Sequence, residues 1–281
     1  MNIQIKATPG CRLFFLFALF FSGIQAGYAE LVLSAPPRED AQTGQDQYGP
    51  IALYLGKILG EKVVYKRPND WGDYANDMRA GKFDIVFDEP HYAAWRMAHV
   101  EHVPTVRLKG TLGYVVVAKS DDKKIKSMKN LIGKPICGLA SPDLGTVTAF
   151  ALYNNPIIQP EIRTIKGNTG DVIQAFLDGS KSCRAAVVSD VIYNILPQDQ
   201  KVLLKVIATS TPVPNQTITV SARIKKIDRE KIEQALTSDE GAAAAEQLLQ
   251  RFSGNDKHFI PAKSDEYKGL EALLEGVVYG W

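Results

Sequence analysis

Short apolar runs alternate with amphipathic stretches of helical period along most of the chain. Runs rich in Leu, Val, Ile and Phe predict strands at 31–34, 62–65 and 83–87, and the periodic stretches between them predict helices at 48–59 and 73–80. Strands that are apolar on both faces are typical of a sheet covered by helices on each side. The strand–helix–strand–helix–strand order therefore predicts a parallel sheet with right-handed crossovers.

The same order returns in the second half of the chain. Strands are predicted at 135–140, 162–165 and 184–188, and helices at 144–153 and 171–177. Because one plan occurs twice, the chain is predicted to form two lobes of the same α/β class.

Two extended segments separate these lobes. An apolar run at 113–118 comes before the second lobe, and Pro212 and Pro214 break the structure before a strand at 217–221. Helices are predicted at 228–236 and 240–252. We expect lobe one to contain residues 30–117 and 213–281, and lobe two to contain residues 118–212. Two such crossings would form a hinge that closes on a ligand.

Residues 1–29 predict a secretory signal peptide. Lys6 and Arg12 precede the apolar run 13–21, and small residues end the segment at Ala29. A transmembrane anchor is the competing interpretation, but the apolar stretch is about twelve residues long, against the roughly 20 that span a bilayer. We therefore expect cleavage near Ala29 and export of the mature chain.

The charge of the mature chain is balanced. Two of the 33 Lys and Arg residues fall in the signal peptide, so 31 basic residues face 31 acidic ones. No basic excess remains to favour binding to nucleic acid or to an anionic membrane.

A polar segment follows the predicted strand 83–87 and contains Asp88, Glu89, His91 and Tyr92. In open α/β sheets, ligands bind outside the carboxyl ends of the strands. This segment is therefore a candidate edge of a ligand cleft.

Four segments together resemble the phosphate/phosphite/phosphonate periplasmic binding protein family. They are AGKFDIVF at 80–87 with Tyr92, NLIGK at 130–134, PVPN at 212–215, and FIPA at 259–262 with Tyr267. The resemblance covers nearly the whole mature chain. It implies a two-lobed type 2 periplasmic binding protein that delivers a solute to membrane transporter components, without catalysis or a cofactor. We expect a monomer in the periplasm.

The resemblance also implies ligand contacts at Tyr48, which starts the first long helix as predicted, at Tyr92, in the loop 141–146, and at Asp190. With the neighbouring polar and aromatic side chains, the candidate ligand-binding residues are Tyr48, Trp71, Asp88, Glu89, His91, Tyr92, Ser141, Asp143, Thr146, Ser189 and Asp190.

The sequence departs from an oxyanion site in this set. Free amides at a helix start hold an anion, whereas Asp143 can cap its own helix and Pro142 lacks a donor. Asp88 and Glu89 add negative charge. We therefore expect a ligand other than a simple phosphate-like oxyanion, although Asp88 and Asp143 could also be helix caps that point away from the cleft.

Two ligand classes fit aromatic side chains beside a carboxylate. One is a cation, which aromatic faces attract, and the other is an apolar body whose hydroxyl group donates to Glu89. The second class would make the protein a periplasmic carrier of a lipid or sterol-type ligand. A ligand-sensing partner of a membrane receptor is a further alternative.

Metal binding and catalysis have weaker signals. Glu89, His91, Tyr92 and Tyr48 could form a site of oxygen and nitrogen ligands, but no metal motif supports it, so no metal is expected. The chain has no nucleophile elbow and no phosphate-binding glycine loop, and we expect no enzyme activity.

The mature chain has two cysteines, Cys137 and Cys183. In the strand order that the resemblance implies, their strands are neighbours, and an oxidising compartment permits a disulfide. Two buried free thiols are the alternative, because neighbouring strands do not always provide the required geometry.

Overall fold

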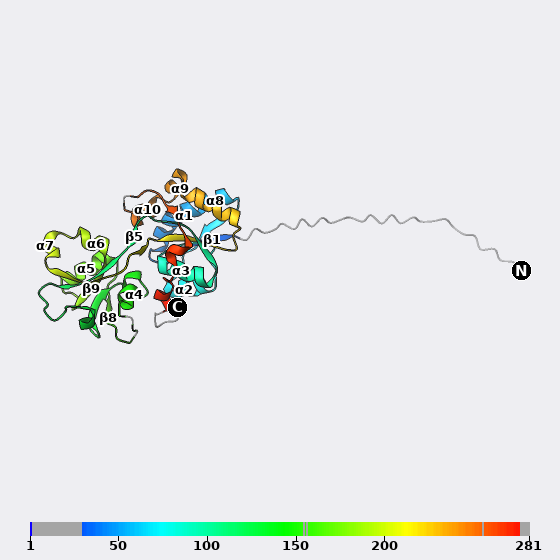
Figure 1. Ribbon diagram of the computed structural model, residues 1–281. Helices are drawn as coiled ribbons and strands as arrows, with labels where there is room; N and C mark the ends of the chain where they lie inside the picture. Colours follow the sequence, from blue (N-terminus) through cyan, green and yellow to red (C-terminus); the bar gives the residue numbers. More distant parts are fainter. Residues whose placement is uncertain (2–29, 154, 156, 255, 276–281) are drawn as a thin grey trace.

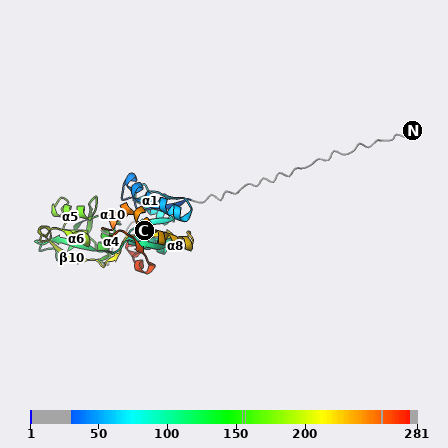
Figure 2. The ribbon, with the colours of Figure 1, turned by 90° about the horizontal axis from the view of Figure 1, so that it is seen from above.

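The computed structural model describes residue 1 and residues 30–275, except 154, 156 and 255. The predicted signal peptide lies outside the described residues, apart from Met1. Figure 1 shows two lobes side by side, and the view from above in Figure 2 separates them in the same way. The prediction of a two-lobed α/β fold is confirmed.

Lobe one is built on a six-stranded sheet with the order β13-β4-β12-β3-β1-β2. Its strands are β1 (Leu31–Ser34), β2 (Val63–Tyr65), β3 (Ile85–Asp88), β4 (His102–Arg107), β12 (Thr217–Ser221) and β13 (Ile260–Pro261). β1 pairs in parallel with both β2 and β3, whereas β12 pairs in antiparallel with β3 and β4. β12 reaches this sheet after the chain has built lobe two.

Helices cover both faces of this sheet (Figure 1). One face carries α1 (Ala41–Leu59), α8 (Lys226–Leu236), α9 (Asp239–Ala244) and α10 (Glu246–Phe252), and the other carries α2 (Trp71–Arg79) and α3 (Pro90–His99). Ile85 and Phe87 of β3 pack in the core on the face that α1, α8 and α10 cover. Val86 between them packs with Tyr74 and Tyr92 in the core on the face of α2 and α3. This alternation follows from the two-residue period of a strand.

Lobe two is built on a five-stranded sheet with the order β10-β6-β9-β7-β8. Its strands are β6 (Tyr114–Lys119), β7 (Pro135–Gly138), β8 (Glu161–Thr164), β9 (Ala185–Ser189) and β10 (Leu204–Thr209). β7 pairs in parallel with β8 and β9, and β6 pairs in antiparallel with β9. The two lobes therefore share the same arrangement of three parallel strands beside an antiparallel one.

The helices of lobe two are α4 (Leu144–Ala151), α5 (Thr169–Leu177), α6 (Asp190–Ile195) and α7 (Gln198–Lys201), with a 3-10 turn at Met128–Leu131. Val172 and Phe176 of α5 pack on one face of the sheet, and Ala149 of α4 packs with Leu131 on the other. In both views α4 lies on the side of lobe two that faces lobe one (Figures 1 and 2).

Two short strands connect the lobes. β5 (Thr111–Leu112) and β11 (Val213–Pro214) pair in antiparallel. The expected boundary between residues 117 and 118 falls within β6, and the division of the chain into lobes by residue number stays a prediction. Near the C-terminus, a 3-10 turn at Ser264–Tyr267 precedes α11 (Ala272–Glu275), which contacts α3 of lobe one and α4 of lobe two.

Several element predictions were wrong. α1 begins at Ala41 rather than Tyr48, because Asp40 accepts a hydrogen bond from the amide of Thr43 at 2.9 Å and caps an earlier turn. The helix predicted at 240–252 is two helices, because Ala245 has non-helical backbone angles. β4 and β10 were not predicted, because they carry polar residues within short runs.

Cys137 and Cys183 are joined in a disulfide, with their Cα atoms 5.6 Å apart, at the start of β9 beside β7. Within the part of the chain that the structure describes, no helix has the length and apolar character that would let it cross a membrane.

Candidate functional site

The strand order reverses at one point in each sheet. β1 lies between β2 and β3 in lobe one, and β7 lies between β8 and β9 in lobe two. Ligands in open α/β sheets bind outside the carboxyl ends of the strands at such a point. We define the interlobe junction as residues at or shortly after the carboxyl ends of β1, β3, β7 and β9: Arg38, Asp88, Glu89, His91, Ser141, Pro142, Asp143, Ser189 and Asp190.

Asp88 ends β3 and is fully buried. Its Oδ2 accepts a hydrogen bond from the hydroxyl of Tyr74 and lies 3.0 Å from Nη1 of Arg96, while its Oδ1 accepts the amide of Glu89 at 2.8 Å. The carboxylate therefore neutralises the buried guanidinium of Arg96. Asp88 is not the helix cap that the alternative interpretation proposed, since Glu89 occupies the N-cap position of α3.

Arg38 connects this buried network to the junction. Its Nη2 lies 3.3 Å from Oδ1 of Asp88 and 3.3 Å from Oε1 of Glu89. The guanidinium carbon also lies 5.9 Å from the ring centroid of Trp71. One cation is thus shared between two carboxylates and an aromatic face.

His91 makes a direct contact between the lobes. Its Nε2 lies 2.9 Å from the carbonyl oxygen of Pro142, and because a carbonyl only accepts, Nε2 carries the proton and donates. The ring is fully buried and lies 3.8 Å from Oε2 of Glu89. Burial lowers the pKa of His91 despite this carboxylate, so the imidazole is neutral at pH 7.

Asp143 caps α4, as the sequence analysis proposed. Its Oδ1 accepts the amide of Gly145 at 3.0 Å and that of Thr146 at 3.3 Å. Burial, with the charge of Glu89 across the junction, raises the pKa of Asp143 to about 7. Thr146 itself is buried, and its hydroxyl donates to the carbonyl of Leu139 at 2.7 Å.

The start of α6 is capped in the same way, whereas Glu89 at the start of α3 makes no side-chain cap hydrogen bond. Ser189 accepts the amide of Ile192 at 3.2 Å and caps α6, while Oδ1 of Asp190 accepts the amide of Val191 at 2.7 Å. Asp190 lies against the crossing between the lobes, because its own amide donates to the carbonyl of Gly113 at 2.9 Å. A Cβ atom at Gly113 would lie 2.3 Å from Oδ2 of Asp190.

Aromatic rings surround the lobe-one side of the site. Trp71 is 42% exposed and stacks on Tyr92 with ring centroids 6.3 Å apart. Tyr48 is fully buried inside α1, between Tyr65 and Phe87. Tyr48 was predicted to start the helix, but it lies seven residues after Ala41, the first residue of α1. Its contact with a ligand stays a prediction.

Sequence reasoning missed Arg38 and Tyr114. Arg38 follows the Pro36-Pro37 pair after β1, and a charged residue in the short loop that follows a predicted strand is a signal that could have found it. Tyr114 begins β6, and a Cβ atom at Gly145 would lie 2.7 Å from its ring. Burial and the carboxylates of Asp143 and Glu89 raise the pKa of Tyr114, so the phenol stays neutral. Ser141 is exposed beside these groups.

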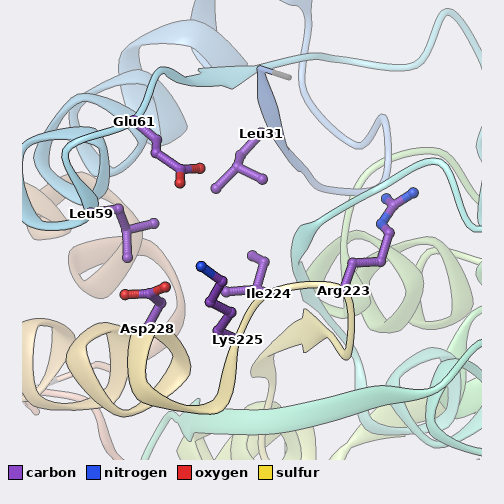
Figure 3. A pocket seen from close by; sticks show the side chains of 7 residues that line it. All are labelled: Leu31, Leu59, Glu61, Arg223, Ile224, Lys225 and Asp228. Carbon is purple, nitrogen blue, oxygen red and sulfur yellow. The ribbon is translucent and has the colours of Figure 1, made fainter. Parts of the chain in front are cut away.

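Other candidate sites have less support. Among residues 30–275, leaving aside 154, 156 and 255, no group of three or more His, Cys, Asp and Glu side chains could hold a metal ion. A cavity of about 110 Å³ is lined by Leu31, Glu61 and Asp228, among others (Figure 3). Leu31 is the first residue of β1, so this cavity lies at the amino end of the strand, opposite the junction.

The chain matches one family model, described as ABC transporter, phosphonate, periplasmic substrate-binding protein, over residues 33–267. No match was found among curated proteins.

Several solved structures share the fold. XAC2383 from Xanthomonas citri, bound to ATP, has a TM-score of 0.67 at 15% identity, over 88% of this chain and 96% of that chain. PhnD1 from Prochlorococcus marinus, in complex with methylphosphonate, has a TM-score of 0.63 at 14% identity, over 88% and 99%. A binding protein component of an ABC phosphonate transporter from Pseudomonas aeruginosa has a TM-score of 0.57 at 15% identity, over 87% and 85%. Identities this low show the fold alone.

Proposed function

Because the chain belongs to the phosphonate family of ABC transporter periplasmic substrate-binding proteins, we propose that it captures a small molecule at the interlobe junction and delivers it to its membrane transporter. This membership confirms the resemblance drawn from the sequence. Binding is expected to close the lobes about β5 and β11, and the function requires no catalysis. A monomer in the periplasm, with the signal peptide removed near Ala29, suffices for it.

The ligand that we propose is not a simple phosphate-like oxyanion. The observation that carries this proposal is that the chain's own side chains accept from the amides at the starts of α4, α5 and α6, although Glu89 at the start of α3 makes no side-chain cap hydrogen bond. The side chain of Asp143 accepts hydrogen bonds from two backbone amides of α4. Ser189 accepts one from an amide of α6, and Asn168 accepts two from amides of α5. A phosphate group binds at a helix start through free amides and the helix dipole, and here that position holds a carboxylate.

The charge at the junction supports the same proposal. Glu89, Asp143 and Asp190 bring three carboxylates to it. A phosphate dianion about 5 Å from one carboxylate would cost several kcal/mol at an effective dielectric constant near 20. The fold neighbours do not decide the question, because one is in complex with methylphosphonate and another is bound to ATP, and ligand choice depends on the site rather than the fold.

The first prediction tests the ligand class by thermal unfolding of the mature protein. We expect neither phosphate nor methylphosphonate to raise the melting temperature, whereas a ligand identified by native mass spectrometry of the purified protein will raise it. Glu89→Gln will weaken binding of that ligand about tenfold or more, because it removes a junction charge and keeps the shape.

The matched control is Glu230→Gln on α8, where the carboxylate is exposed and paired with Lys226. This variant should bind the ligand as the wild type does. Micromolar binding of methylphosphonate by the wild type would refute the exclusion of oxyanions. Mass spectrometry of an organic extract tests the alternative of a lipid or sterol-type carrier, and a co-purifying lipid would favour it.

A further inference from the structure

The carboxylates at the junction outnumber the cations that face them. Arg96 forms an ion pair with Asp88, and Arg38 forms ion pairs with both Asp88 and Glu89. Within the described part of the chain, neither Asp143 nor Asp190 forms an ion pair with Lys or Arg, and their oxygens accept only from amides of their own helices. The junction therefore keeps an excess of negative charge.

Contact between the lobes brings two of these carboxylates together. Nε2 of His91 lies 3.8 Å from Oε2 of Glu89 in lobe one and 2.9 Å from the carbonyl oxygen of Pro142, the residue before Asp143 in lobe two. Like charges in a partly buried place repel unless a proton or another cation lies between them. A proton on one carboxylate removes this repulsion, and a ligand cation between the two carboxylates offsets it.

A second, independent feature is a buried hydrogen-bond acceptor without a partner. Nε2 of the neutral His91 is the donor to Pro142, so Nδ1 is a bare acceptor, and it is buried without a hydrogen-bond partner among the described residues. A buried acceptor without a donor is costly, so Nδ1 favours a ligand that brings an N–H group. A phosphate dianion has no N–H group. Nη1 of Arg38 is a buried donor without a partner in the same set, and an acceptor elsewhere on the ligand would satisfy it.

The aromatic side of the junction suits the same ligand. The ring of Trp71 already lies 5.9 Å from the guanidinium carbon of Arg38, and the side chain is 42% exposed. A ring face in this position attracts organic cations through its quadrupole.

We infer that the ligand is a small organic amine whose ammonium group lies between Glu89 and Asp143, with its carbon skeleton against Trp71. This inference rests on the proposed function. An ammonium group offers three N–H donors to carboxylate oxygens and offsets the repulsion between the lobes.

The test uses isothermal titration of the full mature protein at pH 8. The amine probes are ethanolamine, choline, putrescine and spermidine, the anion probes are methylphosphonate and acetate, and the neutral probe is glycerol. We expect at least one amine to bind and no anion to do so. Glu89→Gln and Asp143→Asn will each weaken amine binding at least tenfold. Asparagine is also a good helix cap, so Asp143→Asn keeps α4 intact.

Matched controls are Glu230→Gln on α8 and Asp77→Asn on α2, whose carboxylate pairs with Lys82 at the surface. Both should bind the amine as the wild type does. The inference is overturned if no amine binds at millimolar concentration, or if both junction variants bind it unchanged. The proposed function fails separately, if no probe of any class binds and no ligand co-purifies with the protein.

Discussion

At the scale of the residue, the most constrained group is the carboxylate of Asp88. It contacts the guanidinium groups of Arg38 and Arg96 and the hydroxyl of Tyr74, and it has no exposed surface. Arg96 is 1% exposed and also donates to Thr219 of β12 at 3.2 Å. The ion pair therefore ties α2, α3, β3 and β12 together behind the junction.

Removal of this charge should destabilise the protein strongly. Asp88→Asn keeps the shape of the side chain but leaves Arg96 buried without its counter-charge. We expect a loss of about 3 to 5 kcal/mol in the free energy of unfolding, measured by urea denaturation. Asp77→Asn, which breaks an exposed pair with Lys82, should cost less than about 1 kcal/mol. Equal losses in the two variants would contradict a structural role for Asp88.

Residue type and position in the chain were enough to find Glu89, His91 and Asp143 as candidates. The pattern of strand and helix showed that they follow strands. The pattern did not show that Asp88 forms a buried ion pair with Arg96. These residues are eight positions apart and meet only when α3 packs on β3. Their roles in ligand binding stay predictions.

At the scale of the element, the disulfide links the start of β9 to β7. Parallel neighbours within one sheet bring Cys183 and Cys137 together, although 46 positions separate them in the chain. A crosslink stabilises chiefly by restricting the unfolded chain, and the effect grows with the length of the closed loop.

We expect Cys137→Ala/Cys183→Ala to lower the free energy of unfolding by about 3 to 4 kcal/mol on the chain-entropy model. Guanidinium denaturation of the double variant and of the wild type measures the difference. A thiol assay on unreduced, denatured wild type should find neither cysteine free in the mature chain. Two free thiols would contradict the disulfide.

Elements with a clear period were predicted well, and those that depend on their neighbours were not. The strand 217–221 was predicted with the bounds that β12 has, because its Thr and Val residues favour a sheet. β4 carries His102, Pro104 and Thr105, which are buried by contacts with β12 and α3 rather than by their own hydrophobicity. No local pattern distinguishes such a strand from a loop.

At the scale of the whole molecule, we expect contact between the lobes to be coupled to the protonation of Asp143. The groups that face it are Glu89 and Arg38 of lobe one and Tyr114 of its own lobe, with His91 bonded to the neighbouring Pro142. Burial and Glu89 raise the pKa of Asp143 to about 7 in this arrangement, and opening of the lobes should return the pKa toward its ordinary value of 3.8. A raised pKa means that the protonated form favours contact between the lobes.

The unliganded protein should therefore open as the pH rises through about 7. We expect its radius of gyration, measured by small-angle X-ray scattering, to increase between pH 6 and pH 8. Asp143→Asn should remove this change, because asparagine does not titrate. The pKa of His91 is lowered by burial, so its own protonation would favour opening only at more acidic pH. A radius that falls with rising pH would contradict the role of Asp143.

The sequence alone determined the class of the fold, because the alternation of apolar runs and helical periods allows little besides covered parallel sheets. It also showed which segments follow strands. Only the tertiary structure decided what those segments do, because charges and hydrogen bonds are satisfied by residues distant in the chain. Arg38 between Asp88 and Glu89, and Glu89 opposite Asp143, are arrangements that exist only after two sheets have formed and the lobes have met.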